Sequence, residues 1–230
     1  MNRMEQIAKR IDHTILKADA SSEQVKKVCG ECKKYGFGMI AINSAQVELC
    51  RKKLEGTGTH VGAAIGFPLG QTDMNVKAFE TRLALEQGAD EIDYVANLTF
   101  VKDGRWDKVA EEMRLITEIC REKGKIIKVI FENCYLTKAE IRRLGEIARE
   151  VEPDFVKTST GFGTGGAIAE DVSLMKEAAG ERVAVKAAGG IRSLDDLLAM
   201  EKAGATRFGT SAGVKIMEEA AARMAAGEVF

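Results

Sequence analysis

Proline, histidine and tryptophan are scarce in this chain. Its 230 residues include two prolines, two histidines and one tryptophan. With only His13 and His60 as imidazoles, a histidine-rich metal centre is not favoured, and both side chains are expected to pack in the core. No stretch rich in proline, glycine or serine divides the sequence, so we expect one domain over residues 1–230.

Charge of one sign and long apolar runs are also missing. The 34 lysines and arginines nearly balance the 35 aspartates and glutamates. The chain therefore has no electrostatic field suited to nucleic acid or an anionic membrane surface. Its apolar runs are strand-sized, well below the ~20 residues of a membrane span, and its first residues lack the apolar segment of a signal peptide. These absences predict a cytoplasmic protein without nucleic-acid or membrane partners.

The five cysteines follow no disulfide framework. An odd number at irregular spacing predicts reduced thiols. Cys29 and Cys32 form a C-x-x-C pair, but they lie in the run 22–34, which has the pattern of an amphipathic helix. We interpret them as half-buried helix residues and leave a redox pair open as the alternative. There is no second C-x-x-C, so a zinc site is not favoured and no metal is expected.

What the sequence does contain is a regular alternation of short apolar runs with longer helical patterns. Segments such as 106–123, 138–151 and 194–203 have apolar residues at i, i+3 and i+4 and are predicted helices. Residues that favour helix starts precede them, for example Thr137 and Ser193. Eight other segments have the composition of strands: Arg10–Thr14, Met39–Ile42, His60–Gly66, Glu91–Val95, Ile126–Phe131, Phe155–Thr158, Val183–Ala187 and Arg207–Thr210.

Eight strand–helix units in 230 residues match the size of a TIM (β/α)8 barrel. The alternative is an open Rossmann-like sheet, which would need a glycine-rich turn after the first strand. The sequence has no such turn there. We therefore predict an α/β protein with a single TIM-barrel domain.

Polar residues stand at the C-terminal ends of several predicted strands, where TIM barrels hold their working groups. These ends carry Asp12 and Thr14 on the first strand, Asp93 on the fourth, and Lys157 and Lys186 on the sixth and seventh. A cation that closes an apolar strand is costly unless it has a task. Two such lysines on neighbouring strands indicate an amine whose pKa is lowered so that it can act as a nucleophile.

The spacing of neighbouring strands gives this hypothesis a magnitude. Parallel strands lie ~4.8 Å apart, and two like charges ~4 Å apart repel by roughly 4 kcal/mol at an effective dielectric constant of about 20. This repulsion could lower the pKa of one lysine by about three, toward ~7.5, so that it forms a Schiff base at neutral pH. Asp93 would then move protons. The alternative is that each lysine is an ordinary surface or salt-bridged residue and that Asp93 is a buried partner of one of them.

Glycine-rich loops follow the sixth, seventh and eighth predicted strands, at 161–166, 188–193 and 209–213. The loops after strands seven and eight of a TIM barrel often hold a phosphate. Glycines let backbone N–H groups approach an anion beside a helix N-terminus. Arg192 could add charge there, although a solvated arginine at a helix start is an equal alternative. The loops predict a phosphorylated substrate.

Five segments carry the most specific motifs in chain order: Ile11-Asp12-His13-Thr14, Ile65–Gly70, Ala89–Asp93, Phe155–Gly163 and Val185–Arg192. Together they resemble deoxyribose-phosphate aldolase, a class I aldolase family. The resemblance runs from about Ile11 to Gly213, nearly the whole chain. The two lysine motifs in combination are its most specific part.

The resemblance implies a TIM barrel that reversibly cleaves 2-deoxy-D-ribose 5-phosphate to D-glyceraldehyde 3-phosphate and acetaldehyde without a cofactor. It implies Lys157 as the Schiff-base lysine, Lys186 as the lysine that tunes it, and Asp93 as the proton-transfer group. A phosphosugar and an aldehyde are then the expected small-molecule partners, and a homodimer is common for such barrels. The implied substrate-binding positions are Gly161, Gly189, Gly190, Gly209 and Ser211 for the phosphate, with Asp12 and Thr14 near the sugar hydroxyls.

The chain also departs from the family pattern. Ala41 and Ser44 stand where many members have cysteine and proline, Tyr94-Val95-Ala96 follows Asp93 in place of Met-Val-Ile, and the last residue is Phe230, where some members use a tyrosine in proton transfer. Three alternatives therefore stay open: an aldolase for another deoxy-sugar phosphate, an isomerase that uses Asp93 as a base, and a phosphosugar-binding protein without catalysis.

Overall fold

The computed structural model describes residues 2–230, and its centre is a closed barrel of eight parallel strands. Each strand pairs with the next along the chain, and β8 pairs with β1. The predicted TIM barrel is confirmed, and no predicted strand end is wrong by more than one residue. The strands are β1 (Ile11–Ile15), β2 (Met39–Asn43), β3 (His60–Ile65), β4 (Glu91–Val95), β5 (Ile126–Ile130), β6 (Phe155–Lys157), β7 (Ala184–Ala188) and β8 (Arg207–Thr210).

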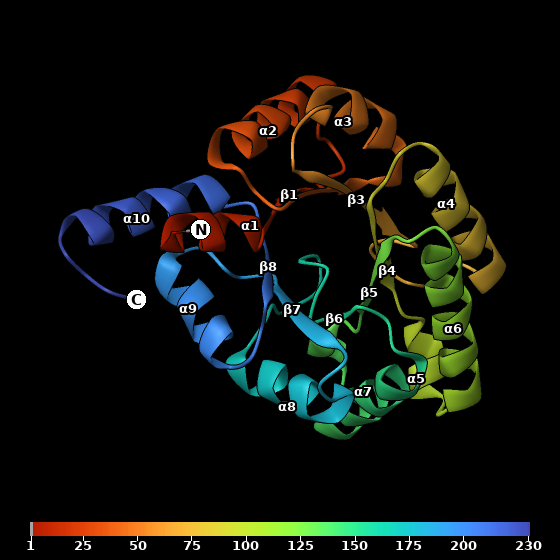
Figure 1. Ribbon diagram of the computed structural model, residues 1–230. Helices are drawn as coiled ribbons and strands as arrows, with labels where there is room; N and C mark the ends of the chain where they lie inside the picture. Colours follow the sequence, from red (N-terminus) through yellow and green to blue (C-terminus); the bar gives the residue numbers. More distant parts are fainter. Residues whose placement is uncertain (1) are drawn as a thin grey trace.

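The helices form a ring around the strands, and the first helix packs beside the last (Figure 1). Two short 3-10 turns, η1 (Ser44–Gln46) and η2 (Asn133–Tyr135), follow β2 and β5. The α-helices are α1 (Arg3–Lys9), α2 (Ser22–Tyr35), α3 (Val47–Leu54), α4 (Met74–Glu86), α5 (Leu98–Lys102), α6 (Trp106–Glu122), α7 (Lys138–Val151), α8 (Ala169–Ala179), α9 (Leu194–Lys202) and α10 (Gly213–Ala225).

The predicted helix starts coincide with side-chain caps. Ser21, Thr137 and Ser193 each accept a hydrogen bond from the backbone N–H three residues on, and the side chain at that third position accepts one from the cap backbone. This reciprocal arrangement satisfies two N–H groups that would otherwise lack partners. The caps therefore fix where α2, α7 and α9 begin.

The two faces of the barrel wall differ in polarity. Residues that point outward, such as Ile92, Val156 and Val185, join a continuous apolar core between the strands and the helices. The alternate positions point into the lumen and include buried charged side chains such as Asp93 and Lys186. A TIM-barrel lumen is usually filled by branched apolar residues, so the charge in this lumen points to function.

Two expectations about single residues have different outcomes. His13 is buried as predicted, but the prediction of a core position for His60 is wrong, because the first residue of β3 leaves 47% of its side chain exposed. Cys29 and Cys32 lie in α2 as predicted and are more deeply buried than expected.

None of the helices in residues 2–230 combines the length and the apolar character needed to cross a bilayer.

Candidate active site

Asp93 lies at the centre of a buried cluster of lysines. Its Oδ2 atom accepts hydrogen bonds from Lys157 Nζ at 2.8 Å and from Lys186 Nζ at 2.7 Å. Its Oδ1 atom accepts one from Lys128 Nζ at 2.9 Å. At most 4% of any of these four side chains is exposed. The structure thus brings together the three residues predicted to be catalytic and adds a third lysine.

Strand register explains this convergence. Lys157 and Lys186 are direct partners across β6 and β7, and Asp93 is paired with Lys128 across β4 and β5. Because residues level with each other on neighbouring strands point to the same side, all four side chains enter the lumen. Sequence reasoning missed Lys128, although a lysine in the middle of the apolar run 126–130 was a usable signal.

Further ion pairs join the cluster into a ring. Lys186 Nζ lies 2.5 Å from Asp12 Oδ2, and Arg207 binds Asp12 Oδ1 at 2.6 Å. Arg207 also lies 3.1 Å from Glu91, which forms a short ion pair with Lys128. Asp12, predicted near the substrate hydroxyls, is instead bound by two cations, Lys186 and Arg207. Sequence reasoning missed Arg207, the first residue of β8.

The lysines and arginine of the lumen outnumber its carboxylates by one, before the half-exposed His60 beside Glu91 is counted. Three carboxylates face four basic side chains in this ring. Unbalanced charge is costly in a buried site. If one lysine is an uncharged amine, the remaining ions match in number. The carboxylates are Asp12, Glu91 and Asp93, and the basic residues are Lys128, Lys157, Lys186 and Arg207.

Lys157 is the lysine whose pKa is lowered in this ring. Its burial lowers its pKa to about 8, the nearby charge of Asp93 opposes that fall, and the charge of Lys186 adds to it. The sequence argument gave repulsion by the second lysine as the main cause, and the structure corrects this, because burial is the larger effect. An appreciable fraction of the Lys157 amine is therefore uncharged near neutral pH.

Asp93 and Lys128 keep their charges. Burial alone would raise the pKa of Asp93, but the charges of Lys128, Lys157 and Lys186 hold it well below its usual value. Burial opposes the charge of Lys128 too, yet Asp93 and Glu91 raise its pKa above that of an ordinary lysine. Asp93 is thus a carboxylate near neutral pH, suited to accepting hydrogen bonds from the lysines around it.

A cavity of about 640 Å³ opens at the C-terminal ends of the strands. Of the buried ring, only Lys157 is among the residues that line it; Asp12, Asp93 and Lys186 are not. The other predicted substrate-binding residues all line it. They are Thr14, Gly161, Gly189, Gly190, Gly209 and Ser211.

The glycine loops approach this cavity closely. Gly189 and Gly190 have φ angles of 83° and 80°, which side chains other than glycine rarely adopt. A Cβ atom at Gly209 would lie 2.9 Å from Ala188 Cβ and 3.2 Å from Lys186 Cε. Backbone N–H groups in such loops can face an anion directly. Arg192 also lines the cavity.

His13 is a further lining residue that the sequence placed only in the core. It comes from β1, is 2% exposed, and its Nε2 atom lies 2.7 Å from Glu31 Oε2 on α2.

At the end of the chain, Phe230 is held by its carbonyl oxygen, which accepts a hydrogen bond from Arg3 Nε at 3.0 Å. Phe230 is not among the residues that line the cavity. Among residues 2–230, no three His, Cys, Asp or Glu side chains are grouped as around a metal ion.

The chain is similar over nearly its whole length to known aldolases. Residues 6–219 match the family described as DeoC/LacD family aldolase. A deoxyribose-phosphate aldolase of Lactobacillus acidophilus is 54% identical over 96% of this chain and 93% of the relative. One from Thermococcus gammatolerans is 50% identical over 93% of this chain and 96% of the relative. The solved structure of the deoxyribose phosphate aldolase from Aeropyrum pernix, described as a unique tetrameric structure, has a TM-score of 0.87 and 34% identity over 93% of this chain and 90% of that one.

Proposed function

The chain belongs to the DeoC/LacD family of aldolases, and on that premise we propose that it reversibly cleaves 2-deoxy-D-ribose 5-phosphate through a Schiff base on Lys157. The products are D-glyceraldehyde 3-phosphate and acetaldehyde. The observation that carries this proposal is a buried lysine with a lowered pKa that opens onto the cavity and donates a hydrogen bond to Asp93.

The reaction begins at the uncharged amine of Lys157. Its nitrogen attacks C1 of the open-chain sugar phosphate, and loss of water from the adduct gives an iminium ion. The new positive charge replaces the one that Lys157 would carry as an ammonium. Asp93 therefore keeps a cationic partner 2.8 Å away on the side of Lys157.

Cleavage of the C2–C3 bond then uses the iminium ion as an electron sink. The C3 hydroxyl loses its proton, the electron pair of the C2–C3 bond moves to form an enamine on Lys157, and D-glyceraldehyde 3-phosphate leaves. Asp93 accepts the proton directly or through a water molecule. Lys186, which shares Oδ2 of Asp93 with Lys157, can donate a proton to the enamine carbon. Hydrolysis of the remaining imine releases acetaldehyde.

The glycine loops would hold the far end of the substrate. The residues Gly161, Gly189, Gly190, Gly209 and Ser211 line the same cavity as Lys157. An anion bound by their backbone N–H groups fixes the sugar so that C1 meets the amine. Thr14 lines the same cavity and would meet a hydroxyl of the sugar.

Borohydride trapping tests the covalent step. The protein is incubated with acetaldehyde and borohydride, digested, and mapped by mass spectrometry. We expect one stable ethyl adduct on Lys157 and none on a Lys157→Leu variant, with the exposed Lys215 as an internal control. Absence of an adduct on Lys157 would favour the isomerase or the binding protein. A panel of deoxy-sugar phosphates then separates this aldolase from one with another sugar preference.

We also propose that the chain forms a homo-oligomer. The Aeropyrum pernix relative is described as a tetramer. On α4 of this chain, Val76, Phe79 and Leu83 are spaced along one helix face and leave 52%, 66% and 41% of their surface exposed. Apolar side chains exposed together in this way are typical of protein interfaces.

We propose a cytoplasmic location because the cysteines are reduced. All five are free thiols, and four of them are buried. Reduced thiols are typical of proteins in a reducing compartment.

A further inference from the structure

Glu132 has an unusual backbone and an unusual environment. Only Glu132 and Glu152 combine a side chain with a left-handed φ angle in residues 2–230, at 58° and 60°. Glu152 is the half-buried C-cap of α7, a common place for this conformation. Glu132 instead follows the C-terminal end of β5 and is 3% exposed. A strained backbone at the working end of a TIM barrel suggests a functional constraint.

The carboxylate of Glu132 binds one residue through both of its oxygens. Oε1 accepts a hydrogen bond from Thr160 N at 3.0 Å, and Oε2 accepts a short one from Thr160 Oγ1. The same hydroxyl accepts a hydrogen bond from Phe162 N at 3.0 Å. Burial of a carboxylate against neutral donors is costly. The segment that follows Lys157 is thus held by a chain of bonds that starts at Glu132.

The left-handed φ angle of Glu132 lets its side chain reach this segment while the backbone on either side stays hydrogen-bonded along β6. Phe131 N donates to Lys157 O at 2.9 Å, and Asn133 N donates to Thr158 O at 2.9 Å. The backbone on either side of Glu132 therefore follows β6. Its side chain extends two residues further, to Thr160.

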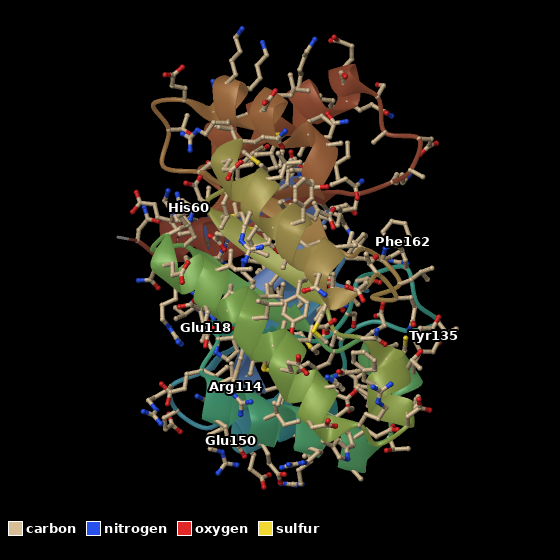
Figure 2. The ribbon with its side chains drawn as sticks, turned by 90° about the vertical axis from the view of Figure 1, so that its right-hand side faces the viewer. His60, Arg114, Glu118, Tyr135, Glu150 and Phe162 are labelled. Carbon is tan, nitrogen blue, oxygen red and sulfur yellow. The ribbon has the colours of Figure 1, made fainter. Side chains whose placement is uncertain are left out.

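The far end of the same loop is fixed independently. Ala167 N donates to Gly189 O at 3.0 Å, and a Cβ atom at Gly166 would lie 2.3 Å from that oxygen. Between the two anchors lie Gly161 and Phe162, both of which line the cavity. Phe162 also meets Phe67 edge to face, with the ring centroids 5.4 Å apart. Figure 2 shows Phe162 and Tyr135 on the same side of the molecule, away from His60.

We propose that Glu132 is a positioning residue that fixes the Thr160–Phe162 turn, so that the backbone at Gly161 faces the phosphate of the substrate. The proposal rests on the proposed function, because it takes the cavity to bind a sugar phosphate. Glu132 touches neither Lys157 Nζ nor Asp93 in the contacts that hold it. Its removal should therefore weaken recognition of the phosphate and leave the amine chemistry intact.

Two substrates separate these effects. The KM for 2-deoxy-D-ribose 5-phosphate depends on the phosphate site, whereas borohydride trapping with acetaldehyde does not, because acetaldehyde carries no phosphate. In Glu132→Gln, and more strongly in Thr160→Val, we expect the KM to rise by about tenfold or more, as for loss of a hydrogen bond to a charged group. The rate of acetaldehyde trapping should stay within about twofold of the unchanged protein. Thr160→Ser keeps the hydroxyl, so its KM should stay close to that of the unchanged protein.

Glu152→Gly is the matched control. It removes the other left-handed glutamate, at a position outside the cavity lining, and should leave both the KM and the trapping rate unchanged. Thermal unfolding of each variant shows that it is folded. The proposal is overturned if Glu132→Gln and Thr160→Val leave the KM within about twofold, or if trapping falls in proportion to the rise in KM. Failure to trap the unchanged protein at all would instead overturn the proposed function.

Discussion

At the scale of single residues, the main property of the site is the protonation state of Lys157. The amine is buried, one carboxylate oxygen binds both it and Lys186, and the lumen already holds enough cations to match its carboxylates. Lys157 also opens onto the cavity, unlike Lys186 and Lys128. Of the three lumen lysines, it therefore combines a lowered pKa with access to substrate.

The first prediction concerns pH. The pKa of Lys157 is lowered to about 8, so the amine is protonated below this pH and neutral above it. The initial rate of acetaldehyde trapping should rise about tenfold per pH unit up to roughly pH 7.5 and level off above about 8.5. Quenched time courses between pH 6 and 10 measure this. A midpoint near ~10.4, the value of an ordinary lysine, would contradict the lowered pKa.

The second prediction concerns Lys128. Its Nζ atom is buried between Asp93 and Glu91, so Lys128→Met would leave both carboxylates with one cation fewer. Asp93 would keep Lys157 and Lys186, and Glu91 would keep Arg207, so neither carboxylate would be left unpaired. Urea unfolding should therefore show a loss of about 1.5–3 kcal/mol, as for hydrogen bonds to charged groups. Lys215→Met, which removes a lysine 62% exposed in a surface pair, should change stability by less than about 1 kcal/mol, and an equal effect of both substitutions would be inconsistent with this account.

At the scale of elements, the sequence predicts most of the barrel because its strands and helices have clear periodicity and caps. β4 and β8 begin and end where the pattern indicates, and Thr137 and Ser193 cap their helices as expected. The short helix α5 was not predicted, because five residues are too few to show a helical period.

The site was predictable in part for the same reason. Lys157 ends β6 and Lys186 lies in the middle of β7, the next strand along the chain, so a barrel brings them together whatever its other details. The ring that joins Asp12 to Arg207 and Glu91 depends on the register between β1 and β8, the first and last strands. Register between strands so far apart in the chain leaves no signal in local periodicity.

The third prediction concerns the packing of α4 and α6 against β4. Lys77 Nζ on α4 lies 2.7 Å from Glu112 Oε1 on α6 and donates to Val95 O at 2.8 Å. Both side chains are buried, and burial lowers the pKa of Lys77 and raises that of Glu112. Lys77→Met or Glu112→Leu alone should each cost about 3–5 kcal/mol, because each leaves a buried charge unpaired.

The double variant distinguishes pairing from loss of packing. The double variant, Lys77→Met with Glu112→Leu, should lose less stability than the sum of the two single losses. The difference should be about 2 kcal/mol or more. Denaturant unfolding of the four proteins measures this coupling. The surface pair of Lys108 and Glu111 should couple by less than about 1 kcal/mol. Additive losses at Lys77 and Glu112 would show that the ion pair does not hold these elements together.

At the scale of the whole molecule, the barrel has a charged interior and an apolar layer outside the strands. Three exposed apolar side chains lie on α4, which runs beside α6 on the near side of Figure 2. The fourth prediction follows from these side chains. Phe79→Ser combined with Val76→Ser should lower the mass measured by light scattering, because it removes exposed apolar area from the proposed interface.

Val229→Ser is the control for that measurement, since Val229 is fully exposed near the end of the chain and away from α4. It should leave the mass unchanged. A monomeric unchanged protein at micromolar concentration, or an undiminished mass in the double variant, would rule out this face as the contact between copies.

The hydrogen bond from Arg3 to Phe230 brings the beginning and the end of the chain to one spot (Figure 1). A rearranged gene could therefore link residue 230 to residue 2 by a short flexible tether and start instead at Gly56, in an exposed turn between α3 and β3. We expect this permuted protein to fold and to react with acetaldehyde and borohydride at the same lysine. The reaction would then require the closed barrel, and it would not depend on the order in which the eight strands occur along the chain.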